Sequence, residues 1–155
     1  MKDQTPSASK ASVACKDCSQ YRQFSWAIAK QEGFFVRGSK PNRLHNPGDI
    51  RVSVGQKFPG QIGTDSQGYA IFKNDYWGWA ALEHLVRKMC VDSPHYSPQM
   101  SIQQVGRHYA TDWKNWSAGV ARNMKCDPHT TLAELFDIPP TVRVQSNPKA
   151  LEGIL

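Results

Sequence analysis

The sequence contains no long run of hydrophobic residues. Residues 1–20 are polar and rich in Ser, Lys and Ala, and they lack the apolar segment of a secretory signal peptide. They also fall short of the roughly 20 apolar residues that a membrane-spanning helix needs. We therefore expect neither a cleaved signal nor a membrane span.

Acidic residues are fewer than basic ones. The chain has 19 Lys and Arg against 13 Asp and Glu, a net charge of +6 and a pI near 9.3. A basic protein favours polyanionic partners, such as a nucleic acid or a bacterial wall with its peptide carboxylates and teichoic acids. The basic residues are scattered, and the sequence has neither an RNA-recognition signature nor a basic heptad region. Charge alone therefore indicates an anionic surface without identifying it.

Cysteine is scarce and is not arranged for a metal site. Cys15 and Cys18 have the CxxC spacing of half a zinc site or of a redox pair. Cys90 and Cys126 are too far apart in sequence to form the second close pair, and the histidines have no metal-ligand spacing. We predict no metal and no cofactor. Disulfides and free thiols both remain open for the cysteines.

The length and the hydrophobic pattern predict one mostly helical domain without internal repeats. A chain of 155 residues can bury a core. The fold class is predicted as α+β with a small irregular antiparallel β-element, and the domain as residues 20–140, between a flexible lead (1–19) and a C-terminal tail (141–155). The pattern predicts helices over 21–32, 75–91, from 101, over 115–124 and after 131, and strands over 50–54 and 69–72.

Capping residues and one glycine add detail to these helices. Gly78, early in its helix, predicts a close approach to another backbone. The predicted caps are Asn74 or Asp75, Ser101 with Gln104, and Thr131 with Glu134.

Glu32 is the residue that points most directly to chemistry. Apolar residues recur at helical spacing over 24–31, so this helix packs on a core and Glu32 lies at its end. Gly33 ends the helix because it tolerates a left-handed backbone, and two phenylalanines follow. A carboxylate desolvated by aromatic neighbours can hold a proton near neutral pH and donate it. The alternative is an ordinary solvated glutamate in a last helical turn.

Three segments in order resemble the lysozyme-like superfamily: AIAKQEGFF (27–35), RLHNPGDIR (43–51) and GYAIF (68–72). More narrowly, they resemble its bacterial and phage peptidoglycan-cleaving branch, which carries the series EG…NPGN(I/L)…G(F/Y)A(V/I)F. The resemblance covers about residues 21–138, and Asp49 stands where that series has Asn. It implies a lysozyme-like fold, with the β-element beside the catalytic helix. It also implies cleavage of the β-1,4 bond between N-acetylmuramic acid and N-acetylglucosamine.

The resemblance assigns Glu32 the role of general acid and base in a muramidase-type glycosidase or a lytic transglycosylase. A second carboxylate, for the oxocarbenium-like carbon, can come from Asp49, Asp65 or Asp75. Asp49 and Asp65 also fit ordinary turns. If no carboxylate faces Glu32, either water attacks or the 6-hydroxyl of the substrate attacks and gives a 1,6-anhydro product.

Four further residues are candidates for a substrate cleft. Tyr109, at a helix end, resembles the tyrosine that lines the cleft opposite the acid in lytic transglycosylases. The resemblance implies a catalytic role for it, with a hydrogen bond near Glu32 or to the sugar, and a core tyrosine is the alternative. Tyr69 and Trp113 can stack on sugar rings, although core packing is open for each. Asn46 either binds an N-acetyl group or holds the Asn-Pro-Gly turn.

The resemblance also implies a partner and a location. We predict a monomer that binds bacterial peptidoglycan and anionic wall polymers and does not bind nucleic acid. It would act in the periplasm, outside the cell or as part of a virion, delivered by phage release, a virion or a secretion apparatus. Two alternatives remain. One is a non-catalytic wall-binding or virion structural domain of the same fold, and the other is a nucleic-acid-binding domain that stacks bases on aromatic residues.

Overall fold

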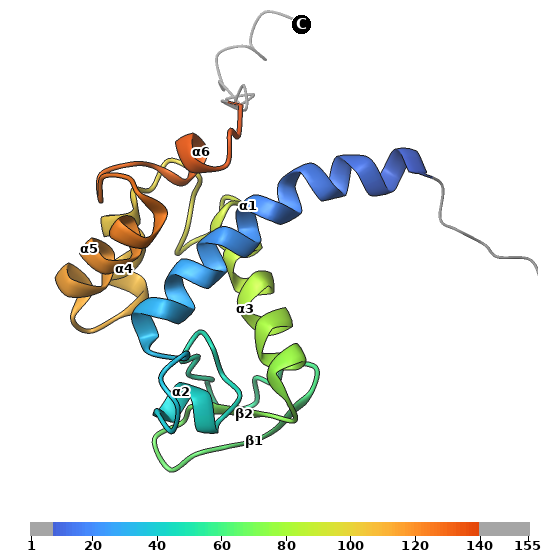
Figure 1. Cartoon of the computed structure of the whole chain (residues 1–155), viewed down its shortest axis with the longest axis vertical. Coiled ribbons are helices and arrows are strands. Elements are labelled where there is room, and N and C mark those ends of the chain that lie inside the picture. Colours follow the sequence, from blue (N-terminus) through green and yellow to red (C-terminus); the bar gives the residue numbers. More distant parts are fainter. Residues whose placement is uncertain (1–7, 140–155) are drawn as a thin grey trace, which may run out of the picture.

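The computed structural model describes residues 8–139, with side chains from residue 19 onward. Within this range the protein is mostly helical and has one small antiparallel sheet, so the coarse α+β class is confirmed (Figure 1). The elements in chain order are α1 (Ala8–Glu32), α2 (Lys40–Arg43), β1 (Gln61–Thr64), β2 (Ala70–Phe72), α3 (Asp75–Met89), α4 (Ile102–Tyr109), α5 (Trp113–Met124) and α6 (Leu132–Leu135).

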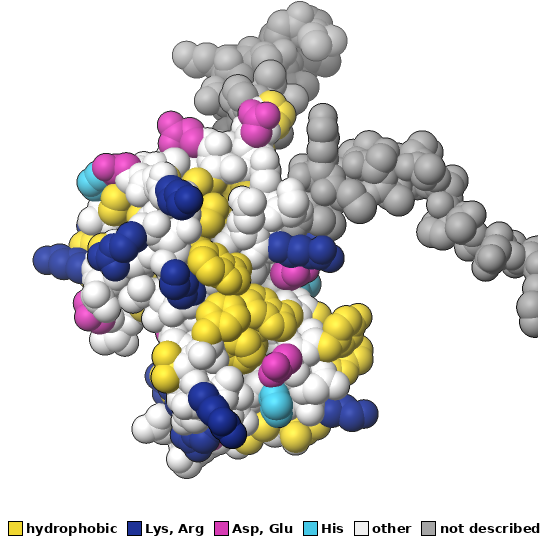
Figure 2. All heavy atoms as spheres, in the orientation of Figure 1, with side chains coloured by type: hydrophobic (Ala, Val, Ile, Leu, Met, Phe, Trp, Pro, Cys, Tyr) yellow, Lys and Arg dark blue, Asp and Glu magenta, His cyan; other side chains and the backbone are white. Residues whose placement is uncertain are grey.

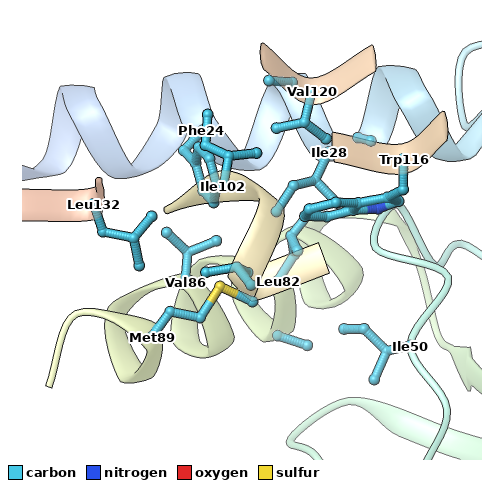
Figure 3. Packing of buried hydrophobic residues seen from close by; sticks show 14 of the residues in the cluster. Phe24, Ile28, Ile50, Leu82, Val86, Met89, Ile102, Trp116, Val120 and Leu132 are labelled. Carbon is cyan, nitrogen blue, oxygen red and sulfur yellow. The ribbon is translucent and has the colours of Figure 1, made fainter. Parts of the chain in front are cut away.

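The hydrophobic core lies between the helices. Helix α1 packs against α5 and α3, and α4 packs against α5. Because burial of apolar area is the main favourable contribution to folding, this packing fixes the end of α1 relative to α4 and α5. Buried side chains from these helices and from α6 meet in the core: Phe24, Ile28, Leu82, Val86, Met89, Ile102, Trp116, Val120 and Leu132 (Figure 3).

The predicted helix caps and the predicted close approach are confirmed. An added Cβ at Gly78 would lie 1.9 Å from the carbonyl oxygen of His45, so only glycine lets this loop pack directly on α3. The capping residues accept backbone N–H groups as expected at three helix starts: Asn74 in α3, Ser101 with Gln104 in α4, and Thr131 with Glu134 in α6.

The first helix is longer than predicted. It begins at Ala8, whereas we expected a helix from Tyr21 and a flexible lead over residues 1–19. Residues 8–20 contain neither Gly nor Pro and include three alanines, so nothing local interrupts the helix. Residues 1–7 and the predicted tail 141–155 lie outside the described residues. Helix α5 also begins two residues earlier than predicted, because Asp112 caps it.

The sheet differs from the prediction in which segments pair. The first strand is Gln61–Thr64, which lies between the two predicted strands, 50–54 and 69–72. It pairs with Ala70–Phe72 through an irregular register between Gln61 and Gly63. Of the predicted strand 50–54, only Arg51 forms an isolated bridge, with Tyr69. An irregularity of this kind accommodates Gly63, a residue type that is otherwise unfavourable inside a strand.

Several features are absent from the part of the chain that the structure describes. None of its helices combines the length and apolar character needed to cross a bilayer. Its His, Cys, Asp and Glu side chains form no group of three that could hold a metal ion. Cys90 and Cys126 are free thiols. The side chains of Cys15 and Cys18 lie outside the described residues.

Candidate active site

Glu32 is the last residue of α1, and Gly33 follows it with a φ of +83°. The left-handed Gly33 turns the chain away, so the Glu32 side chain is left at the end of the helix. Helix α5 comes unusually close there, because an added Cβ at Gly119 would lie 1.7 Å from Gln31 Oε1. This approach brings the indole of Trp116 to Glu32, and its Nε1 donates a hydrogen bond of 2.8 Å to Oε1.

The environment of Glu32 disfavours its charged form. Burial raises its pKa from 4.5 to about 7, and the nearby charge of Asp49 adds to the rise. The hydrogen bond from Trp116 and the charge of Lys40 act in the opposite direction. A carboxylic acid with a pKa near 7 can both donate and recover a proton at neutral pH, as general acid–base catalysis requires.

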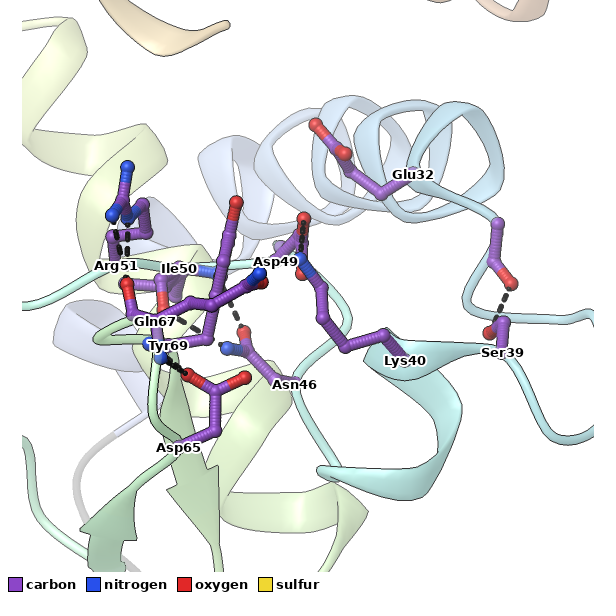
Figure 4. Close-up of polar contacts among 12 residues, drawn as sticks. Glu32, Ser39, Lys40, Asn46, Asp49, Ile50, Arg51, Asp65, Gln67 and Tyr69 are labelled. Atoms are coloured by element: carbon purple, nitrogen blue, oxygen red, sulfur yellow. Dashed lines mark hydrogen bonds and ion pairs between the residues drawn. The ribbon is translucent and has the colours of Figure 1, made fainter.

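Asp49 supplies a second carboxylate, held in a different way. It adopts a φ of +46°, a left-handed conformation that Asp and Asn tolerate better than most residues. Lys40 Nζ lies 3.0 Å from its Oδ2, and Oδ1 is buried without a hydrogen-bond partner among the described residues. Figure 4 shows Glu32 at the end of α1, with Asp49, Lys40 and Tyr69 on the segments beneath it. Burial raises the pKa of Asp49, and Lys40 lowers it.

Tyr109 connects the helices to the loop that carries Asp49. Its ring stacks on Trp116, with centroids 4.9 Å apart, and its hydroxyl donates to the carbonyl of Gly48. Burial, followed by the charge of Glu32, raises the pKa of Tyr109 well above its usual value, so the phenol keeps its proton. Tyr109 therefore positions the residue next to Asp49, and its hydroxyl bonds to the loop rather than to Glu32.

A cavity of about 590 Å³ opens between these groups. It is lined by Glu32, Asp49, Tyr69 and Tyr109, four of the six predicted site residues. Tyr69 also packs against Lys40, whose Nζ lies 3.1 Å from the ring centroid. The volume is typical of a small-molecule site.

The other two predicted site residues, Asn46 and Trp113, do not line this cavity. Asn46 is fully buried, and its amide bonds to the N–H and C=O of Ile50 and to the C=O of Ala70. The prediction that Asn46 binds substrate is therefore wrong, because its side chain holds the loop instead. Trp113 is absent from the cavity lining and packs against Arg107, 4.6 Å from the ring centroid. Trp113 is half-buried at the start of α5, and its role in a substrate cleft stays a prediction.

The other two candidates for the second carboxylate, Asp65 and Asp75, lie outside the cavity lining. Asp65 accepts the backbone N–H groups of Gln67 and Tyr69, which is the turn role. Asp75 is exposed, and its Oδ1 lies 2.7 Å from His45 Nδ1. Neither lines the cavity, so Asp49 is the carboxylate that shares it with Glu32.

Sequence reasoning missed several groups at this site. Nothing in the local sequence around Trp116 singled it out. Arg51 lies inside a segment that carried the resemblance, and Arg107 and His108 come just before Tyr109. The places of all three in the cavity lining come only from the fold. Lys40 gave no signal, since its partners Asp49 and Tyr69 are brought to it by the fold.

Comparisons of the chain with family models, with curated proteins and with solved structures find no match.

Proposed function

We propose that this protein is a lysozyme-like glycosidase that cleaves the glycan strand of peptidoglycan, between N-acetylmuramic acid and N-acetylglucosamine. The observation that carries the proposal is the state of Glu32. It is a carboxylic acid with a pKa of about 7, at the edge of a cavity that also holds the Asp49 carboxylate. Two carboxyl groups in different environments are the usual requirement for cleaving a glycosidic bond.

In this proposal Glu32 is the acid. Its proton passes to the glycosidic oxygen as the bond to the anomeric carbon breaks, so the leaving sugar departs as a neutral alcohol. The Trp116 N–H then stabilises the carboxylate that remains. Glu32 recovers a proton from the attacking hydroxyl group, which completes the cycle.

Asp49 is assigned the second role. Lys40 favours its charged form, and a negative carboxylate stabilises the positive charge that develops at the anomeric carbon. The buried Oδ1 is available to accept a hydrogen bond from an attacking hydroxyl or from the sugar. Hydrolysis and transglycosylation differ only in whether that hydroxyl belongs to water or to the substrate.

The other cavity residues fit an acidic amino sugar. Tyr69 lines the cavity, where an aromatic ring can contact pyranose C–H groups, and Lys40 and Arg51 both lie over this ring. Arg51 and Arg107 bring positive charge to the lining, as the lactyl carboxylate of muramic acid requires.

The surface charge does not favour the nucleic-acid alternative. On the face shown in Figure 2, Lys and Arg lie apart around a central group of hydrophobic side chains, over α1 and α3. A continuous basic stripe, which contact with a phosphate backbone needs, is not seen on this face.

The test is digestion of purified peptidoglycan, with mass spectrometry of the soluble products. We expect muropeptides from the wild type and at least about a 100-fold slower release from Glu32→Gln, because an amide cannot donate and recover a proton. Glu83→Gln is the matched control, since Glu83 pairs with Arg22 away from the cavity. A reducing end identifies hydrolysis, and an anhydro end identifies transglycosylation. Sedimentation with walls and no soluble product would overturn the proposal in favour of a wall-binding domain.

A further inference from the structure

A second cavity, of about 430 Å³, has one lining residue, Leu85, in common with the first. Leu85 lines both cavities, so the two are separated by little more than one side chain. The second cavity is enclosed by α3 and by the loop that precedes β1. The chemistry proposed for Glu32 uses no residue unique to it.

The apolar wall of this second cavity is held in place by packing. Phe58 is 8% exposed, and its ring lies 6.2 Å from that of Phe72 in the core. The loop passes directly under Trp77, since an added Cβ at Gly60 would lie 2.1 Å from the indole. The N–H of Lys73 bonds to the carbonyl of Gly60, which ties the loop to β2. A wall built in this way exists before any ligand arrives.

The charge of the second cavity has one sign. Lys57, Lys88 and His84 line it, and the lining includes no Asp or Glu. Neither lysine forms an ion pair with a carboxylate within residues 19–139. A preformed apolar wall with two unpaired ammonium groups is complementary to a flexible chain that carries both apolar groups and carboxylates.

We infer that the second cavity binds the carboxylate-bearing peptide branch of peptidoglycan while the glycan strand occupies the first. The branch leaves the strand from a sugar, so an adjoining cavity is where it must go when that sugar lies near Leu85. Its carboxylates pair with Lys57 and Lys88, and its apolar side chains pack on Trp77 and Phe58. This binding role depends on the proposed glycan cleavage and determines which strands the protein prefers.

The experiment compares two substrates, intact glycan strands and the same strands stripped of their peptides. The measured quantity is the ratio of kcat/KM on intact strands to kcat/KM on bare strands. In Lys57→Gln/Lys88→Gln this ratio falls about fivefold relative to wild type, as expected for the loss of two exposed ion pairs. The change lies in KM for the intact strands. The control, Lys114→Gln/Lys125→Gln, removes the same charge outside both cavities and keeps the wild-type ratio. Lys57→Arg/Lys88→Arg restores most of it.

Each outcome has a separate meaning. A wild type that cleaves neither substrate overturns the proposed function and the peptide site with it. A wild type that cleaves both, with the same ratio in the Lys57/Lys88 variant, overturns the peptide site alone. An equal loss on intact and bare strands would also overturn it, because the lysines would then act on the glycan.

Discussion

The two sides of the first cavity hold their carboxyl groups with different partners. On the helical side, Glu32 is desolvated and receives one neutral N–H from Trp116, so it keeps a proton near pH 7. On the loop side, burial also raises the pKa of Asp49, but the ion pair with Lys40 opposes that rise. In the proposed mechanism the same functional group serves as an acid on one side and as an anion on the other, because its neighbours differ. We therefore expect substitutions on the helical side and on the loop side to have separate, distinguishable effects.

The largest expected effect on stability comes from the loop side, through Asn46→Ala. The substitution removes three buried hydrogen bonds and leaves the N–H of Ile50 without its partner, at a cost of about 4 kcal/mol. Chemical denaturation measures this loss, with the exposed Asn115→Ala as the control. A loss below about 1 kcal/mol would show that the loop does not depend on Asn46 and would restore a binding role for that residue.

The helical side predicts a stability effect that depends on pH. Because the pKa of Glu32 is raised on folding, its contribution to stability is fully present below pH 4.5 and is lost as the pH rises through about 7. At pH 8 the free energy of unfolding of the wild type is therefore about 3 kcal/mol lower than that of Glu32→Gln. Denaturation at both values should show the variant to be more stable at pH 8 and no more stable than wild type at pH 4. Equal curves at pH 8 would mean that Glu32 is solvated.

A smaller effect links the two sides. The charge of Asp49 raises the pKa of Glu32, and the charge of Lys40 lowers it. Asp49→Asn should therefore move the titration of Glu32 to lower pH, and Lys40→Met should move it to higher pH. Titration of the Glu32 side-chain carboxyl by NMR measures both shifts without any substrate. If the pKa of Glu32 shifted in the same direction in both variants, the charges of Asp49 and Lys40 would not have opposite effects on it.

The two sides also differ in how far the sequence predicts them. On the helical side the signals are local. The caps at Ser101 and Thr131 and the apolar spacing before Glu32 are local signals, so these helices and the position of Glu32 at a helix end could be predicted. The start of α1 was missed because a polar composition without Gly or Pro is compatible with both a helix and a flexible lead.

On the loop side the contacts are between residues far apart in the chain. Strand β1 was missed because its glycine sits in an irregular pairing, and no periodicity reveals which segments pair. The role of Asn46 depends on Ala70, 24 residues later, and that of Asp49 on Lys40. The resemblance pointed to the segments that contain Asn46 and Asp49. Only the fold separates the side chain that supports the loop from the one that faces the cavity.

The smallest expected effects compare two tryptophans of α5. Trp116→Phe keeps the stack on Tyr109 but removes the N–H that favours the Glu32 carboxylate, so the pKa of Glu32 should rise further. One hydrogen bond to a charged group corresponds to about 2 kcal/mol, or roughly 30-fold in the rate of glycan cleavage. Trp113→Ala should change that rate by less than about threefold, because Trp113 does not line the cavity and packs against Arg107, which does. Trp113→Ala could instead slow cleavage more than Trp116→Phe does, with equal thermal stability in the two variants. That result would mean that the substrate cleft extends beyond Arg107 and includes Trp113.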